Sequence, residues 1–165
     1  MILGVISDTH GNLELMHKAV ALLENRFYAT RIIHLGDDYA DKETLEREGH
    51  PMSGVPGLWC PEYNDPRIPN QVVEEVEGMR VAYAHSDNDL PPLTGDLGLC
   101  LVGHTHRYGI VMRQGVPFMN PGHLKSARDR TRFPTFGLAR VTGALLYLSV
   151  HDLDGEVVLE EQYPR

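Results

Sequence analysis

The sequence predicts an α/β fold in which two β-sheets pack face to face and the helices lie outside them. In the first part of the chain, an apolar strand, an amphipathic helix and a second apolar strand follow one another as a βαβ unit. From residue 71 onward, short strands alternate with glycine-containing turns. An early βαβ part followed by a strand-rich part favours two packed sheets with helices outside. The length of 165 residues predicts one domain spanning residues 1–165.

The first part of the chain contains the expected helices. Its opening run is apolar and uncharged as far as Ser7, which is typical of a strand buried on both faces. Asn12 offers an N-cap to a helix whose apolar residues recur every three or four positions up to Phe27. A second strand is expected over residues 31–35, and a short polar helix over residues 41–48 that stops at Gly49. The proline-rich residues 53–70 predict a long loop that is functional or mobile.

The second part is predicted to consist mainly of strands. Residues 72–76 and 79–84 flank Glu77-Gly78 and form a hairpin, and residues 99–102 read as a buried strand. Further strands are expected at residues 110–112, 116–119, 136–141, 145–150 and 156–162, with turns at Gly115, Gly143 and Gly155.

Charge and composition limit the expected partners and location. The net charge of −8 argues against nucleic acid as a partner, because proteins that bind it usually carry a basic face. No secretory signal or membrane-spanning run is evident, so no membrane association is expected. Cys60 and Cys100 are too few for a disulfide framework, which predicts a cytoplasmic protein with free thiols. The number of subunits is left open, with a homo-oligomer as one alternative.

Residues that commonly bind metals follow the predicted apolar strands. They are Asp8, His10, Asp37, His85, His104 and His106. Residues two apart on an extended chain point to the same side, so Asp8 and His10 can aim at one point, and His104 and His106 repeat this spacing. Glycine before Asp37 and before His104 allows a sharp turn and close approach of the backbone.

Six such residues exceed what one tetrahedral zinc requires. They suit two divalent cations that share a carboxylate, and such a pair can clamp a phosphoryl group and activate a water molecule. The alternative is a chance set of helix caps and core histidines.

The order Asp-x-His, Gly-Asp, a middle His and Gly-His-Thr-His resembles the calcineurin-like metallophosphoesterase superfamily, and more closely its small bacterial and archaeal phosphodiesterase-like branch. The similarity covers essentially the whole chain, including Asn120-Pro121-Gly122. It implies a four-layer α/β/β/α sandwich of two mixed β-sheets flanked by helices. It also implies a ligand set: Asp8, His10 and His106 hold the first metal, Asp37 bridges, and His85 and His104 hold the second.

One stretch departs from the family pattern. Leu58 stands in the register of the asparagine that binds the second metal, and Trp59 stands where some members carry a histidine that contacts phosphate or protonates the leaving group. The replacement for the missing ligand is left open among the residues that follow: Cys60, Glu62, Asn64 and Asp65.

The resemblance implies a divalent-metal-dependent phosphoesterase that hydrolyses phosphodiesters, or less readily monoesters, by attack of metal-bound hydroxide at a dinuclear site. Asp37 and His85 are the expected catalytic residues, and the substrate is a small phosphate ester. Manganese is the expected metal, with iron, nickel or zinc as alternatives. The alternative function is a non-catalytic scaffold or binding module with a degenerate metal site.

Three further features near the expected site are left open at this stage. His34 reads as a core histidine or a hydrogen-bond partner of a ligand. His123 lines the pocket or lies in an exposed loop, and the basic run 125–132 either is solvated or contacts substrate.

Overall fold

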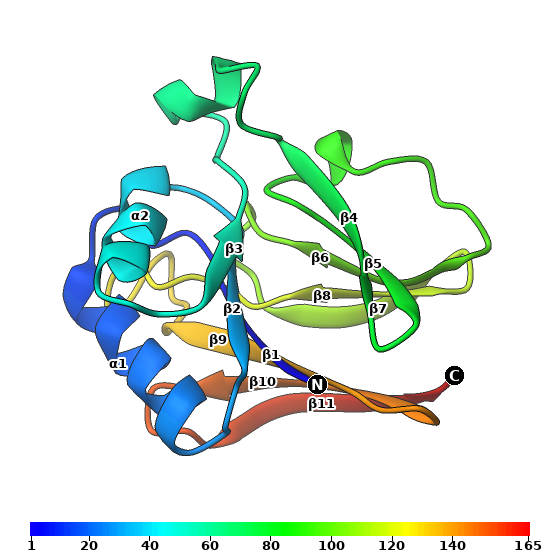
Figure 1. Cartoon of the computed structure of the whole chain (residues 1–165). Helices are drawn as coiled ribbons and strands as arrows, with labels where there is room; N and C mark the ends of the chain where they lie inside the picture. Colours follow the sequence, from blue (N-terminus) through cyan, green and yellow to red (C-terminus); the bar gives the residue numbers. More distant parts are fainter.

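The computed structural model describes residues 1–165 and consists of two mixed β-sheets packed against each other (Figure 1). The six-stranded sheet has the order β11 (Val157–Pro164), β10 (Leu145–Asp152), β9 (Thr135–Val141), β1 (Ile2–Ile6), β2 (Arg31–His34) and β3 (Met52–Gly54). The five-stranded sheet has the order β4 (Gln71–Val76), β5 (Met79–Ala84), β6 (Leu97–Val102), β8 (Val116–Asn120) and β7 (Gly109–Arg113). The predicted α/β fold class is confirmed.

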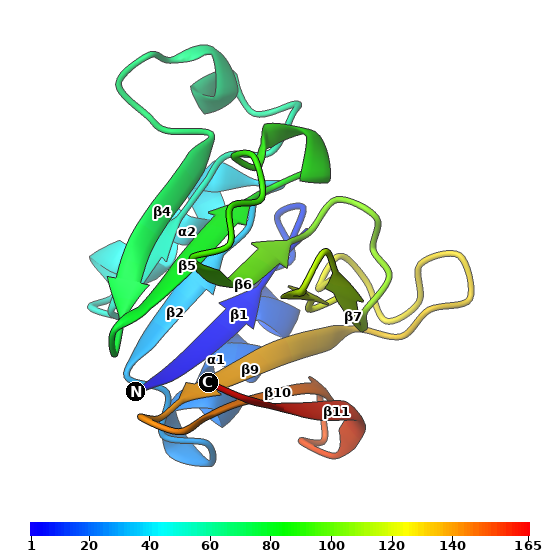
Figure 2. The same cartoon turned by 90° about the vertical axis from the view of Figure 1, so that its right-hand side faces the viewer.

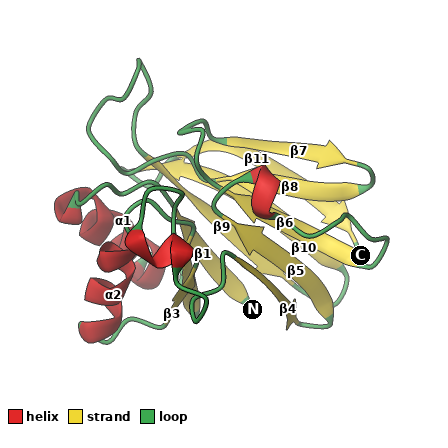
Figure 3. Ribbon diagram, turned by 90° about the horizontal axis from the view of Figure 1, so that it is seen from above, coloured by secondary structure: helices red, strands yellow, loops and turns green.

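Two α-helices cover the outer face of the six-stranded sheet. Helix α1 spans Leu13–Asn25 and α2 spans Tyr39–Arg47, and the two lie together on one side of the molecule (Figure 3). The side chain of Asn12 accepts a hydrogen bond from the Leu15 N–H at 3.1 Å, as its predicted N-cap role requires. Met16, Val20 and Leu23 of α1 pack against apolar residues of the sheet.

The outer face of the five-stranded sheet is covered by an extended segment. This segment, residues 86–96, contains the short 3-10 turn η2 (Asp87–Asp89). Leu90 and Leu93 pack against a small cluster that includes Cys100 and Phe118 on the sheet. The fourth layer of the sandwich is therefore a loop with a single helical turn.

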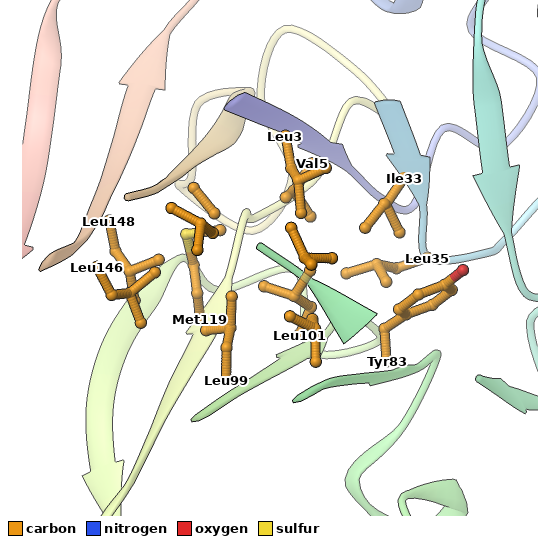
Figure 4. Packing of buried hydrophobic residues seen from close by; sticks show 14 of the residues in the cluster. Leu3, Val5, Ile33, Leu35, Tyr83, Leu99, Leu101, Met119, Leu146 and Leu148 are labelled. Carbon is orange, nitrogen blue, oxygen red and sulfur yellow. The ribbon is translucent and has the colours of Figure 1, made fainter. Parts of the chain in front are cut away.

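The largest apolar cluster fills the space between the two sheets (Figure 4). Leu3 and Val5 of β1 face Leu99 and Leu101 of β6 across this space. Ile6 of β1 belongs instead to the cluster beneath the helices. Strand β1 is therefore buried on both faces, which explains why its sequence is an unbroken apolar run.

The parallel pairing within each sheet brings functional loops to one edge of the molecule. Strand β1 pairs in parallel with β2, and β5 pairs in parallel with β6. In Figure 2 the arrowheads of β1, β5 and β6 point toward the same edge, above which the loop of residues 55–70, with its 3-10 turn η1 (Pro61–Asn64), projects. The loops after β1, β5 and β6 are where open α/β sheets place their ligands.

None of the helices has the length and apolar character required to cross a membrane.

Candidate metal centre

The turns that follow β1 and β6 have the same unusual backbone conformation. Asp8, His10, His104 and His106 have φ angles of 54°, 48°, 68° and 58°. Such angles are uncommon for residues other than glycine, and each costs about 1–3 kcal/mol when the surroundings enforce it. Strain of this kind clusters at functional sites, where it aims side chains that a relaxed backbone would direct elsewhere. The two turns thus aim their side chains at a shared space.

One group of ligand-type atoms joins the two turns. The Nε2 atom of His106 lies 3.2 Å from Asp8 Oδ1 and 3.2 Å from His10 Nε2. All three ligand atoms fall within 4.8 Å of one another, which is close enough to surround one cation. Residues 98 positions apart in the chain, His106 and Asp8, therefore meet as the sequence predicts.

A second group shares Asp8 with the first. It consists of Asp8, Asp37 and His85, all of which are buried. Asp37 Oδ2 lies 3.5 Å from His85 Nε2 and 3.7 Å from His10 Nε2, so this oxygen stands between the two groups. Two adjacent groups that share a carboxylate, here Asp8, are the arrangement expected for two neighbouring cations.

Hydrogen bonds at Nδ1 fix the ring orientation of two of the histidines and direct their Nε2 atoms into the site. His85 Nδ1 lies 2.7 Å from the carbonyl oxygen of Leu35, which can only accept, so Nδ1 carries the proton and Nε2 faces the site with a free lone pair. His106 Nδ1 donates in the same way to Asp129 Oδ2 at 2.7 Å. Such a partner at the second nitrogen is the usual support of a metal-binding histidine.

The buried, unpartnered ligand atoms of the site would be stabilised by bound cations. The buried atoms Asp8 Oδ1, Asp37 Oδ1 and His85 Nε2 have no hydrogen-bond partner. Burial of polar and ionised groups without partners is costly, and two close carboxylates also repel each other. Carboxylate oxygen and imidazole nitrogen together suit divalent first-row metals. The residues present therefore fit a pair of divalent cations.

The close approach of carboxylates and imidazoles in the site shifts the pKa values of Asp8 and His106. Burial would raise the pKa of the Asp8 carboxyl, but the nearby imidazoles of His106 and His85 and the Ser7 hydroxyl lower it below its usual range. The carboxylates of Asp8 and Asp129 raise the pKa of His106, although burial opposes this. Without a metal, a proton on His106 compensates part of the charge that a cation would otherwise neutralise.

His104 has a different position from the other five predicted ligands. Its backbone N–H donates to Asp8 Oδ2 at 3.0 Å, and its ring lies 5.1 Å from the ring of His85. The residue is exposed and belongs to neither three-residue group. The structure thus gathers five of the six side chains in two groups and puts His104 at the rim.

Glycines allow the backbone to approach the carboxylates closely. A Cβ atom at Gly103 would lie 2.0 Å from Ser7 Oγ and 2.9 Å from Asp8 Oδ2. A Cβ atom at Gly36 would lie 2.8 Å from His85 Nδ1, and one at Gly57 only 1.6 Å from Asp37 Oδ1. Gly36 and Gly103 confirm the close approach that was expected beside Asp37 and His104.

His34 connects the loop of Asp37 to the turn after β1. The Gly36 N–H donates to His34 Nδ1 at 3.1 Å, and His34 Nε2 donates to Thr9 Oγ1 at 3.0 Å. Thr9 Oγ1 in turn donates to the carbonyl oxygen of Asp37 at 3.2 Å. Burial lowers the pKa of His34 to about 3, so the ring stays neutral and keeps this proton arrangement. His34 is therefore both a core residue and a support of the site.

Asp129 is a site residue that the sequence did not reveal. It lies in the loop between β8 and β9, 23 positions after His106. Its only sequence signal is that it interrupts the basic run 125–132 with a negative charge. Beside it, His123 is fully buried with its ring 5.5 Å from that of His106, so the exposed-loop alternative for His123 is wrong.

Part of the basic run borders the site. Lys125 and Arg130 line a cavity of about 320 Å³ together with His104, His106 and Asp129. Arg128 does not line it. This cavity forms the basic side of the cluster.

The loop that departs from the family pattern borders the cluster at His10 and Asp37. A second cavity of about 320 Å³ is lined by His10, Asp37, Asp38, Trp59, Cys60 and Pro61. Of the four candidates for the missing ligand, Cys60 alone lines this cavity, whereas Asp65 is engaged by Arg67. Burial, together with the nearby carboxylates, raises the pKa of the Cys60 thiol. Leu58 is half-buried and Trp59 stands exposed.

A family model described as "Calcineurin-like phosphoesterase superfamily domain" matches residues 1–144. The comparison with curated proteins gives no match.

Three solved structures share the fold across nearly their whole lengths. YfcE, a phosphoesterase from E. coli, is 22% identical with a TM-score of 0.74, covering 98% of each chain. A novel archaeal phosphodiesterase is 18% identical with a TM-score of 0.66, covering 100% of each. Wild-type Vps29 from Entamoeba histolytica, complexed with zinc, is 19% identical with a TM-score of 0.64, covering 99% of each.

Proposed function

Because the chain belongs to the calcineurin-like phosphoesterase superfamily, we propose that it is a divalent-metal-dependent phosphoesterase that hydrolyses phosphodiesters and, less readily, phosphomonoesters. The observation that carries this proposal is the convergence of unpartnered, buried ligand atoms from three separate strand ends. The substrate is a small phosphate ester, since the chain is acidic overall and only one side of the cluster is basic.

Each predicted ligand has a role in this proposal. Asp8, His10 and His106 would hold the first cation, Asp37 would bridge, and His85 and His104 would hold the second. The position of Asp37 Oδ2 between His10 and His85 supports the bridging role. The pair of cations would lower the pKa of a water molecule toward neutrality and offset the charge of the phosphoryl group. Manganese is the metal that we propose, although iron, nickel and zinc suit the same ligands.

Asp37 and His85 are the proposed catalytic residues. Asp37 orients the attacking water through the carboxylate oxygen that stands between the two groups. His85 keeps its Nε2 lone pair directed into the site because Leu35 O holds the proton on Nδ1. The exposed ring of His104 lies 5.1 Å from the ring of His85, which supports a shared role of the two imidazoles at the second cation.

The leaving group receives no proton from position 59, because indole is not an acid that can serve this purpose. Water or another residue must supply the proton. Esters whose leaving groups are stable as anions should therefore react fastest, and aryl esters should exceed alkyl esters.

The test is turnover of an aryl phosphodiester and an aryl phosphomonoester by Mn²⁺-supplemented protein. Asp37→Asn removes the bridging charge and should abolish turnover of both. Asp96→Asn is the matched control, because Asp96 precedes β6 and so lies at the edge opposite to the site, where it pairs with Arg80. Equal turnover by wild type and Asp37→Asn would exclude the proposed mechanism.

The second candidate function is a scaffold with a weakened metal site. Leu58, which cannot bind a metal, favours it. Metal analysis after dialysis separates the two functions. Close to two equivalents per chain support the enzyme, whereas none supports the scaffold.

A further inference from the structure

A solvent-exposed tryptophan lies beside two of the proposed metal ligands. Trp59 is the only tryptophan of the chain and is 86% exposed. An aromatic side chain of this size can offer about 150–250 Å² of surface to a ligand. Trp59 lines the same cavity as His10 and Asp37. Its indole ring therefore borders the space directly in front of two proposed metal ligands.

The rest of this cavity suits an uncharged group that donates hydrogen bonds. Asp38 occupies the N-cap position of α2, yet its side chain makes no capping hydrogen bond and is exposed. Its carboxylate is free to accept hydrogen bonds from hydroxyl or amino groups. Pro61 adds an apolar surface beside the indole. Because Asp37 and Asp38 would repel an anion, the cavity fits the alcohol part of an ester better than its phosphate.

The two sides of the cluster differ in charge, which orients a bound ester. Lys125 and Arg130 border the cluster on the side of His104 and His106. Anionic parts of a ligand are favoured on that side, whereas a neutral ring is favoured at Trp59. The phosphoryl group would then lie over the metal ligands between the two cavities.

We propose that Trp59 stacks on a nucleobase of the substrate, so that the preferred substrates are nucleoside phosphate esters. This inference rests on the proposed function for the position of the phosphoryl group. Stacking on an aromatic side chain tolerates any base, because each base has a flat π-face. Asp38 accepts a hydrogen bond from a ribose hydroxyl or a base amino group. A simple alkyl ester offers neither contact.

Fluorescence of the single tryptophan tests this inference directly. Mn²⁺-loaded protein is titrated with adenosine 5′-monophosphate and, as the matched ligand without a base, with ribose 5-phosphate. The adenosine compound should change the emission of Trp59 saturably, at concentrations at which ribose 5-phosphate has no effect. Calorimetry then gives both affinities for the variants that lack the reporter.

Trp59→Ala should weaken binding of adenosine 5′-monophosphate about 5- to 150-fold, and Trp59→Phe should weaken it less. The affinity of both variants for ribose 5-phosphate should differ from that of wild type by less than twofold. Tyr28→Ala is the control: Tyr28 is 72% exposed but precedes β2, at the edge opposite to the site.

Three outcomes would overturn the inference. The first is that wild type binds adenosine 5′-monophosphate and ribose 5-phosphate with equal affinity, and the second is that it binds neither. The third is an unchanged affinity of Trp59→Ala for adenosine 5′-monophosphate, which would favour a protein-docking role for the indole. Failure of the proposed function is a separate result. If no ester is hydrolysed but the base preference and its loss in Trp59→Ala persist, hydrolysis is excluded and the nucleoside site stands.

Discussion

Replacing Gly57 with alanine should displace the carboxylate that is proposed to bridge the two metals. The added Cβ would lie 1.6 Å from Asp37 Oδ1, whereas ordinary contact begins at 3.4 Å, so the oxygen must retreat by 3.4 − 1.6 = 1.8 Å. Metal–ligand distances tolerate about 0.2 Å. The displacement is also about half of the 3.5 Å that separates Asp37 Oδ2 from His85 Nε2. Asp37 can then no longer serve both groups.

We expect Gly57→Ala to weaken Mn²⁺ binding by more than about 100-fold, because even loss of a hydrogen-bond partner of a ligand costs about 10- to 100-fold. The overpacked loop should lower the free energy of unfolding by about 1–3 kcal/mol. Calorimetric titration with Mn²⁺ and urea unfolding in chelator measure the two effects. Gly95→Ala is the control, since nothing lies within 4 Å of a Cβ there.

A double variant separates the clash from general damage to the loop. In an Asp37→Ala background, the carboxylate that meets the new Cβ is gone, so Gly57→Ala should cost less stability than it does in wild type. The coupling between the two substitutions is expected at about 0.5–3 kcal/mol. Wild-type Mn²⁺ affinity in Gly57→Ala would refute the inferred crowding of Asp37.

Two further predictions concern residues behind the ligands. Asp129→Asn removes the charge of the carboxylate whose Oδ2 lies 2.7 Å from His106 Nδ1. It should weaken Mn²⁺ binding about 10- to 100-fold in a chelator competition and leave the free energy of unfolding unchanged. A Mn²⁺ affinity equal to that of Asp96→Asn would contradict this. For His34, the folded-state pKa of about 3 lies below the ordinary 6.5, so the unfolded chain binds a proton first and stability falls as pH drops from 6.5 toward 3. Relative to pH 8, this group should cost metal-free protein about 2 kcal/mol at pH 5. Urea unfolding of wild type and His34→Asn at both pH values tests it, and equal pH dependence of the two would show that His34 is not responsible.

The fold could be predicted from the sequence because strand and helix periodicities are strong and local. The apolar run of β1, the α1 stripe and the hairpin of β4 and β5 lie where their patterns place them. Strand β3 was not predicted. It has only three half-buried residues, too few for an alternating pattern, and it forms because β2 offers a parallel edge for pairing.

The candidate site was predictable where the sequence marks it and not where only the tertiary structure does. Asp8 and His10, like His104 and His106, stand two apart after an apolar strand, and this spacing marks them as candidates. Their side chains are aimed by left-handed turns beyond the strand ends, which the sequence pattern does not specify and which leave His104 outside both groups. Asp129 stands in a loop without such a pattern, and its contact with His106 depends on how β8 returns the chain to the same edge. The exposure of Trp59 likewise depends on the course of the loop of residues 55–70.

The most direct test is the metal content of the purified chain. Protein dialysed against Mn²⁺ and then against metal-free buffer is analysed by mass spectrometry for metal per chain, beside Asp37→Asn. We predict close to two equivalents in wild type and a clear reduction in Asp37→Asn. No bound metal in folded wild-type protein, or an undiminished content in Asp37→Asn, would contradict the proposal that these carboxylates and imidazoles hold a pair of cations.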